Sequence, residues 1–304
     1  MTASRARPSK SRRTPAPRRD AASLPQTSAE RERRLSATLL RLGKLNQEAL
    51  DRITAIQRQT NAPFARTAAK LGLLTRDDLE TAIGVQNGYL REHEGEGRLP
   101  PEAIIIRRPA SKEAEQFRAL RTRLLTSKDS EKLNLFAVAA NRTSGEADHV
   151  TINLAASLAQ IGKRVIIVDA DLRGRRLASR FGVSSEPGLK DSLDGACDIR
   201  KAIRPTIIAN LSILTAGEPA AGAAELLIGE TLRLTLDYLR CAYDVVIVMA
   251  TPFGEIADAQ FVWSAAGAVF VVTRRHQDRG PEIKALDSAI RQVGADVFAA
   301  VLAG

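Results

Sequence analysis

The chain is short of the residues on which several classes of protein depend. Its only cysteines are Cys197 and Cys241, without a CxxC pair, which argues against a disulfide framework or a zinc site. The three histidines are too scattered to predict a metal site: His93, His149 and His276. The sequence has no apolar run of about 18 residues and no apolar segment typical of a secretory signal. We therefore expect neither a membrane span nor secretion, but a cytoplasmic protein.

The positive charge is concentrated at one end of the chain. The formal net charge is +10, and residues 1–19 contain seven Lys or Arg and no acid: Arg5, Arg7, Lys10, Arg12, Arg13, Arg18 and Arg19. Because serine, proline and alanine separate these cations and few apolar residues accompany them, we predict a disordered tail over residues 1–33. Such a tail is either simply solvated or docks on an anionic membrane surface or an acidic partner. The tail alone is weak support for nucleic-acid binding.

Residues 34–57 and 63–86 form an internal repeat with an offset of 29 residues. Gly43 and Gly72 coincide in the two copies, and each follows a short apolar-periodic segment that we expect to be a helix ended by the glycine. Asn46 and Thr75 then stand where the cap of a second helix belongs. The sequence predicts two helical hairpins in a small all-α domain spanning residues 34–90.

The repeat resembles the MshEN domain at the N-terminus of type II secretion and pilus ATPases. Both copies carry Leu-Gly-x-Leu in the middle and end in glutamine. The resemblance implies a cyclic di-GMP site built from Arg34, Leu35, Leu39 and Gly43 of the first copy. The second copy opens with Pro63 instead of arginine, so it lacks one of the guanidinium groups that would contact a guanine. The alternative is a helical domain that only makes protein contacts.

Residues 91–112 combine glycines, a Pro-Pro pair and charges of both signs around the apolar run Ile104–Ile106, which is typical of an interdomain linker.

From residue 113 to 304, apolar runs alternate with helix-length amphipathic segments. We expect strands at 133–140, 164–170, 211–217, 243–250, 268–274 and 297–304. Runs that are this apolar predict a doubly wound parallel sheet covered on both faces, whose ligands would lie at the carboxyl ends of the strands.

The first of these strands leads into the frame of a phosphate-binding loop. Residues 135–160 read as an apolar strand, a glycine-containing turn and a helix. The loop and helix start are degenerate at the positions that would bind a nucleotide: Gly145, Glu146, Ala147, Asp148, His149 and Val150. Asp148 replaces the lysine that neutralises phosphates, and His149 replaces the hydroxyl residue that binds Mg²⁺. A negative charge at this position opposes a polyanionic ligand.

The ordered succession of segments from residue 113 resembles the bacterial tyrosine kinases of capsule and exopolysaccharide synthesis, whose P-loop fold is of the MinD/ParA type. With the N-terminal repeat included, the pattern resembles the chain-length-determinant kinases of the EpsG type. The resemblance implies that Asp169 and Asp171 correspond to aspartates that support Mg²⁺ and activate the attacking tyrosine. Without a metal they would be structural groups bonded to nearby backbone N–H. The other Mg²⁺-associated aspartate of the family is Ala250 here, which offers no oxygen ligand.

Two cations could replace the missing lysine. Lys163 precedes a strand and is therefore expected at the wrong end of the sheet, whereas Arg173 follows the aspartate pair. A further match is the sequence Glu115-x-x-Arg118-x-x-Arg121, which the resemblance implies to be an oligomer interface, although an internal ion pair is the simpler reading.

These observations favour a non-catalytic regulator or scaffold that works with a membrane polysaccharide chain-length determinant, as a homo-oligomer and peripheral to the inner membrane. The alternatives are an atypical ATP- and Mg²⁺-dependent tyrosine kinase completed by a partner, and a cyclic di-GMP receptor. No cofactor follows from the sequence with certainty.

Overall fold

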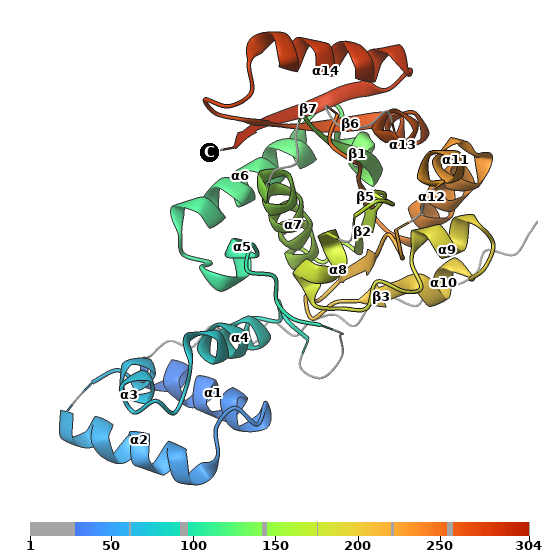
Figure 1. Ribbon diagram of the computed structural model, residues 1–304. Coiled ribbons are helices and arrows are strands. Elements are labelled where there is room, and N and C mark those ends of the chain that lie inside the picture. The colour runs from blue at the N-terminus through green and yellow to red at the C-terminus, as the bar shows by residue number, and fades with distance from the viewer. Residues whose placement is uncertain are drawn as a thin grey trace, which may run out of the picture.

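The computed structural model describes residues 28–60, 62–91, 97–141, 145–174, 176–219, 222–253 and 258–303. Residues 1–27 of the predicted basic tail lie outside them, whereas residues 28–33 are helical, so the predicted end of the tail at residue 33 is wrong. A small group of helices packs below a larger α/β domain (Figure 1). The expected order of an all-α domain followed by a doubly wound sheet is therefore confirmed.

The helical module consists of α1 (Ser28–Arg41), α2 (Gln47–Thr60), α3 (Phe64–Lys70) and α4 (Arg76–Gln86). Its core is apolar and built from both repeats: Leu39, Leu45, Ile53, Phe64, Ala68, Leu74 and Ala82. Thr75 caps α4 by accepting a hydrogen bond from the Asp78 amide, and Asn46 accepts one from the Ala49 amide at 2.8 Å, as predicted. Helix α1 begins at Ser28 rather than Arg34, because the Glu32 carboxylate holds that turn by accepting hydrogen bonds from Gln57 and the Phe64 amide.

The glycines that end the first helix of each hairpin have left-handed backbones, with φ of 64° at Gly43 and 65° at Gly72. An added Cβ would meet no atom within 4 Å at either position, so alanine would be penalised by backbone conformation alone. We predict that Gly43→Ala and Gly72→Ala each lower the free energy of unfolding by about 1–2 kcal/mol in denaturant titrations. Gly145→Ala, whose added Cβ also meets nothing and whose φ is not left-handed, is the control. Equal stability of all three variants would contradict this prediction.

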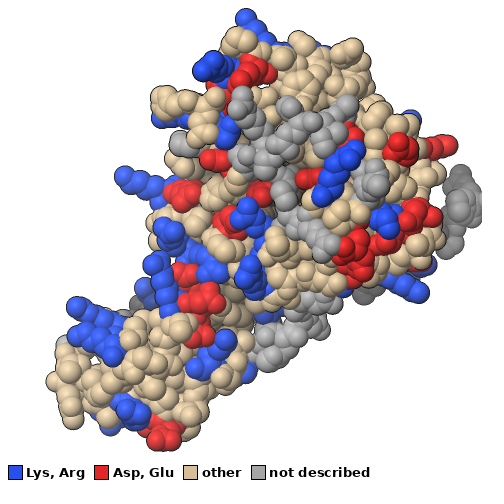
Figure 2. All heavy atoms as spheres, viewed as in Figure 1, with Lys and Arg blue, Asp and Glu red and all other residues tan. Residues whose placement is uncertain are grey.

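The segment that the sequence assigns to a linker is packed against both domains. Its short helix α5 (Ile104–Arg107) has three buried isoleucines. The Arg107 guanidinium pairs with Asp77 and Glu80 of α4 and donates hydrogen bonds to the carbonyls of Leu99 and Pro100. Acidic and basic atoms meet at this junction of the two lobes (Figure 2).

A second contact ties the module to the sheet domain. After α4 the chain makes a β-bridge between Leu90 and Ile208 and a hydrogen bond of 2.7 Å from the Arg91 amide to the Ile207 carbonyl. Gly84 allows the close approach, because an added Cβ there would lie 2.7 Å from a Leu90 methyl. The module is therefore held by contacts on α4, α5 and this bridge.

The sheet has seven strands in the order β3-β4-β2-β5-β1-β6-β7. Six of them coincide with the predicted segments, β7 starting one residue earlier than predicted, and run parallel: β1 (Leu135–Ala140), β2 (Val165–Asp169), β4 (Leu211–Leu214), β5 (Val245–Met249), β6 (Ala268–Arg274) and β7 (Asp296–Ala303). The seventh, β3 (Ile203–Pro205), pairs antiparallel with β4 and was not predicted from the sequence. It is only three residues long, contains an arginine and a proline, and therefore has no hydrophobic pattern.

Helices cover both faces of the sheet, as the apolar strands predict. One face packs on α6 (Lys112–Thr126), α7 (Gly145–Gln160) and α8 (Arg176–Phe181) around Phe117, Leu154 and Phe181. The other packs on helices that include α12 (Glu230–Ala242), α13 (Asp258–Ala266) and α14 (Gly280–Gln292), around Leu236, Trp263 and Ile290. Shorter elements complete the domain: the 3-10 helix Ser130–Asn134, α9 (Leu189–Leu193), α10 (Ile199–Ala202) and α11 (Ala223–Ile228). Within the described ranges, none of the helices has the length and apolar character needed to cross a membrane.

Candidate functional site

The sheet brings the predicted site residues together at the carboxyl ends of its central strands. Strands β2, β5 and β1 are neighbours, so the start of α7, the Asp169 turn and the end of β5 adjoin. Backbone hydrogen bonds join these segments, from the Ala170 amide to the Met249 carbonyl (2.8 Å) and from the Phe253 amide to the Ala140 carbonyl (2.9 Å). This is the edge where ligands bind in folds of this kind.

Asp148, which stands where the kinase resemblance implies a phosphate-binding lysine, is paired inside the protein. Its side chain is only 3% exposed, and one carboxylate oxygen lies 3.3 Å from an Arg180 nitrogen of α8. The same guanidinium pairs with Glu102, just before α5. We call Glu102, Asp148 and Arg180 the Arg180 cluster. A buried carboxylate needs such a partner, since an uncompensated charge is costly to bury.

The next residue of the loop also faces the protein. His149 Nε2 lies 2.9 Å from a Glu113 carboxylate oxygen of α6, and its ring packs against Phe117 with centroids 5.4 Å apart. Ala147 and Val150 are buried in the core. Glu146 is half-buried and Gly145 is exposed. In the described part of the loop, no side chain occupies the role of a cation aimed at phosphates.

Asn153, one turn further along α7, connects this helix to the linker segment. Its side chain is fully buried, accepts a hydrogen bond from the Ile105 amide at 3.0 Å and donates one to the Glu102 carbonyl at 2.6 Å. The sequence analysis identified none of three residues as part of a site: Asn153, Glu102 and Arg180. Asp148 and Asn153 stand among the buried positions of α7, but no local pattern of the sequence distinguishes them from the other polar residues of this helix.

Asp169 and Asp171 hold the turn after β2. The two oxygens of Asp169 accept hydrogen bonds from the amides of Asp171 (3.2 Å) and Leu177 (3.1 Å). Asp171 accepts a longer one, of 3.4 Å, from the Arg173 amide. Both carboxylates are buried. Their hydrogen bonds match the structural role that the sequence left open beside the catalytic one.

Arg173, the better placed of the two substitute cations, is bound to another acid. Its Nε lies 2.8 Å from a carboxylate oxygen of Asp258, and this hydrogen bond raises the pKa of the guanidinium. Asp258 is a buried residue at the start of α13 that sequence reasoning missed. Ala250 is buried in the apolar core near the same edge, beside Thr251, whose buried hydroxyl has no hydrogen-bond partner within the described residues.

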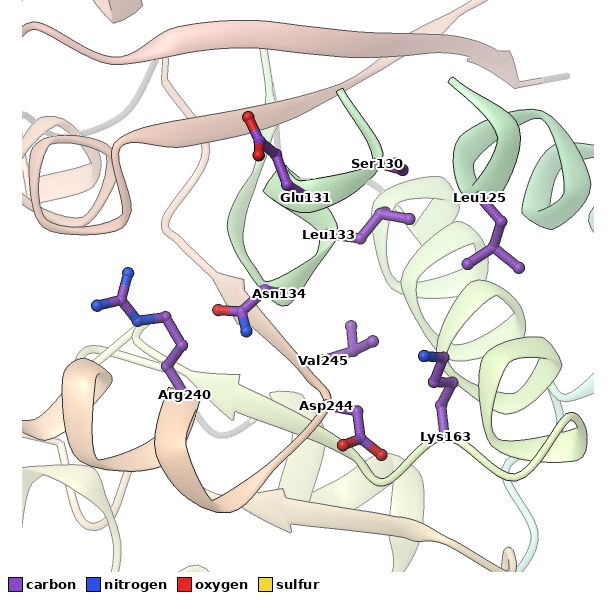
Figure 3. A pocket seen from close by; sticks show the side chains of 9 residues that line it. All are labelled: Leu125, Ser130, Glu131, Leu133, Asn134, Lys163, Arg240, Asp244 and Val245. Carbon is purple, nitrogen blue, oxygen red and sulfur yellow. The ribbon is translucent and has the colours of Figure 1, made fainter. Parts of the chain in front are cut away.

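Lys163 lies at the amino ends of the strands, away from the other predicted site residues, as its place before β2 predicts. It lines a pocket of about 570 Å³ (Figure 3). Asp244 lines the same pocket and pairs with Arg164 at 3.0 Å. Partial burial raises the pKa of the Asp244 carboxyl, but the hydrogen bonds from Arg164 outweigh it and leave the pKa below its ordinary value.

The predicted interface on α6 is engaged within the chain. Arg118 pairs with Glu115 at 2.7 Å and donates to the Pro109 carbonyl, and Arg121 donates to the Ser157 carbonyl of α7 at 2.8 Å. Burial and the neighbouring Arg118 lower the pKa of Arg121. Glu115 is exposed, so a partner can still reach this face through it.

The residues implied for cyclic di-GMP do not share one surface. Arg34 and Gly43 are exposed, and Leu35 is half-buried. Leu39 is fully buried in the core of the module, where it packs against both repeats. A ligand could reach Arg34, but Leu39 acts here as a core residue.

Taken together, the described residues do not fit Mg·ATP. A buried anion stands where the kinase resemblance implies a lysine, Ala250 stands where it implies a second Mg²⁺ carboxylate, and Asp169 already accepts two backbone hydrogen bonds. Across the described ranges, no three His, Cys, Asp or Glu side chains are grouped as a metal site would require.

Comparisons with known proteins agree with the fold. The chain is 30% identical over 202 residues to the tyrosine-protein kinase etk of Escherichia coli K12, covering 66% of this chain and 28% of that protein. It is 28% identical over 188 residues to the tyrosine-protein kinase ptk of Acinetobacter johnsonii, covering 62% and 26%. The chain thus spans little more than a quarter of these relatives' lengths.

The kinase domain of the Escherichia coli tyrosine kinase ETK superposes with a TM-score of 0.64 and 27% identity, covering 69% of this chain and 82% of that domain. The family model described as "AAA domain" matches residues 138–291. This match begins within β1 and ends within α14, so it includes residues 145–150 and the Asp169 turn. The chain belongs to this AAA-domain family, and its α/β domain is homologous to the bacterial tyrosine kinases.

Proposed function

We propose that the protein is a non-catalytic regulator or scaffold in exopolysaccharide biosynthesis or export, derived from a tyrosine kinase. The observation that carries this proposal is the Arg180 cluster. Where the kinase resemblance implies a lysine aimed at phosphates, a buried carboxylate binds an arginine of the same chain. Catalysis of phosphoryl transfer consists mainly of neutralising phosphate charge with cations, and an anion at this position does the opposite.

The regulatory role would be exerted through partners. By homology to capsule and exopolysaccharide kinases, the partner we propose is a membrane protein that determines polysaccharide chain length, contacted by an oligomer at the inner membrane face. Glu115, Arg118 and Arg121 are the candidate interface, and the basic tail is the candidate membrane contact.

The direct test is calorimetric titration with Mg·ATP and Mg·ADP. We expect no saturable binding to the native protein. A rebuilt loop should bind: Ala147→Gly, Asp148→Lys and His149→Ser, combined with Arg180→Gln because a lysine at position 148 would otherwise face the Arg180 guanidinium. Each charged hydrogen bond regained with phosphate contributes roughly 1.5–3 kcal/mol. The Arg180→Gln variant alone is the control, with thermal melting to verify that each variant is folded.

Micromolar nucleotide binding by the native protein, followed by tyrosine phosphorylation that requires Asp169, would replace this proposal with the kinase alternative. Adding the cytoplasmic segment of a chain-length determinant to the same assay tests whether a partner completes the site. Titration with cyclic di-GMP, with Arg34→Ala as the control, tests the receptor alternative, which rests on the exposed Arg34.

A further inference from the structure

A pocket opens at the amino ends of the strands, at the end of the sheet opposite to the Asp169 turn. Four segments surround it: the end of α6, the 3-10 helix Ser130–Asn134, the turn at Lys163, and residues 240–245 between α12 and β5. Its volume of about 570 Å³ is within the range of small-molecule sites. The side chains that line it indicate which kind of molecule fits.

The pocket has an apolar base formed by Leu125, Leu133 and Val245 (Figure 3). Leu133 and Val245 belong to the core of the domain, and Leu125 is half-buried beside them. A ligand with an apolar body would cover this base and remove it from water, which favours binding.

Lys163 provides a charge that the protein does not compensate. Its ammonium group points toward Val245 in Figure 3, and no carboxylate of the described chain lies within ion-pair distance of it. Asp244, which is close enough for Lys163 to lower the pKa of its carboxyl, is already held by Arg164. The Arg164 guanidinium and backbone amide donate hydrogen bonds of 3.0 and 2.9 Å to its two carboxylate oxygens. Lys163 is therefore available to an anion that enters the pocket.

Two neutral polar groups line the pocket from the 3-10 helix. The Ser130 hydroxyl and the Asn134 amide make no side-chain hydrogen bond within the part of the chain that the structure describes. Arg240 completes the rim and pairs with Asp237 at 3.0 Å on the surface. An apolar base with a few polar groups around it is the usual composition of a ligand pocket.

The charges of the lining favour a ligand with one negative charge. Two cations, Lys163 and Arg240, are balanced by two anions, Glu131 and Asp244. A ligand with several negative charges would be repelled by these acids, whereas a carboxylate needs only one cation. We propose that the pocket binds a small monocarboxylic acid, whose carboxylate pairs with Lys163 and whose apolar body covers the apolar base.

Ligand-observed NMR titration of the full chain tests the proposal with probes that each differ in one property. 2-Naphthoate has both the charge and the apolar body; 2-naphthamide lacks the charge, 2-naphthylmethylamine reverses it, and acetate lacks the body. We expect saturable binding of 2-naphthoate and about tenfold weaker binding of 2-naphthamide, the effect of losing one charged hydrogen bond. The amine and acetate should not bind. Equal or tighter binding of the amide or the amine would overturn the proposal.

Two lysine variants locate the bound carboxylate. Lys163→Met removes the ammonium group but keeps an apolar stem, and Lys284→Met makes the same change at an exposed lysine of α14, outside the pocket. We expect 2-naphthoate to bind Lys163→Met about tenfold more weakly and Lys284→Met with native affinity. Both variants should melt like the native protein. Native affinity in a folded Lys163→Met variant would place the carboxylate elsewhere and overturn the proposal.

Chemical acetylation provides a local measurement on the native protein. Lys163 and Lys284 are both exposed and should react with acetic anhydride. Saturating 2-naphthoate should slow acetylation of Lys163 and leave that of Lys284 unchanged, as measured by mass spectrometry. An unchanged rate at Lys163 would contradict the proposal. These experiments involve neither a nucleotide nor the Arg180 cluster, so the pocket stands or falls separately from the proposed function.

Discussion

Replacing Arg180 with alanine is expected to lower the free energy of unfolding by about 3 kcal/mol. The change removes the cation shared by Asp148 and Glu102, whose side chains are 3% and 14% exposed. Breaking a buried ion pair by deleting one partner typically costs about 3–5 kcal/mol. We expect the lower end, since Arg180 itself is 36% exposed and water can partly replace it. Urea denaturation followed by circular dichroism would measure the effect.

Arg200→Ala is the matched control for this prediction. Arg200 also pairs with an aspartate, Asp198, but on the surface, where ion pairs contribute less than about 1 kcal/mol. A loss of stability as small for Arg180→Ala as for Arg200→Ala would mean that the Arg180 cluster contributes little. The main support for the proposed non-catalytic role would then disappear.

The second large effect is expected for Asn153→Leu, a change that keeps the number and branching of the side-chain heavy atoms. It leaves the buried Ile105 amide without the hydrogen bond that Asn153 provides, whereas the Glu102 carbonyl keeps the one that it accepts from the Ile104 amide at 2.7 Å. A buried polar group left unsatisfied costs about 1–3 kcal/mol, so the free energy of unfolding should fall by about that amount.

A control on the same helix is Ser157→Ala. Ser157 is equally buried, but its hydroxyl only bonds the Leu154 carbonyl within α7. Its loss should change stability by less than about 1 kcal/mol. If Asn153→Leu were as mild as this control, the attachment of the linker segment to α7 would not depend on the asparagine.

The sheet could be predicted because most of its strands are continuous apolar runs, which are typical of parallel strands buried on both faces. The helical repeat could be predicted because Gly43, Gly72 and Thr75 have specific backbone roles. The Arg180 cluster could not, because Glu102, Asp148 and Arg180 come from three separate segments, and no local pattern records which charges meet after folding. For the same reason Asp258 was missed as the partner of Arg173. The loss of the lysine was evident from one position, but what had replaced its interaction required the structure.

The packing of α5 has a consequence for dividing this protein into pieces. Ile105 and Ile106 lie in the core of the α/β domain, while Arg107 holds α4 of the module. A fragment that begins at Lys112 would expose the apolar surface that these isoleucines cover. It would also remove Glu102, which bonds to Asn153 and pairs with Arg180. Such a fragment should aggregate on purification, whereas one that begins at Arg98 would keep its own cover. The boundary for expressing the kinase-like domain alone therefore lies before the Pro-Pro pair, and not at the first helix that resembles a kinase.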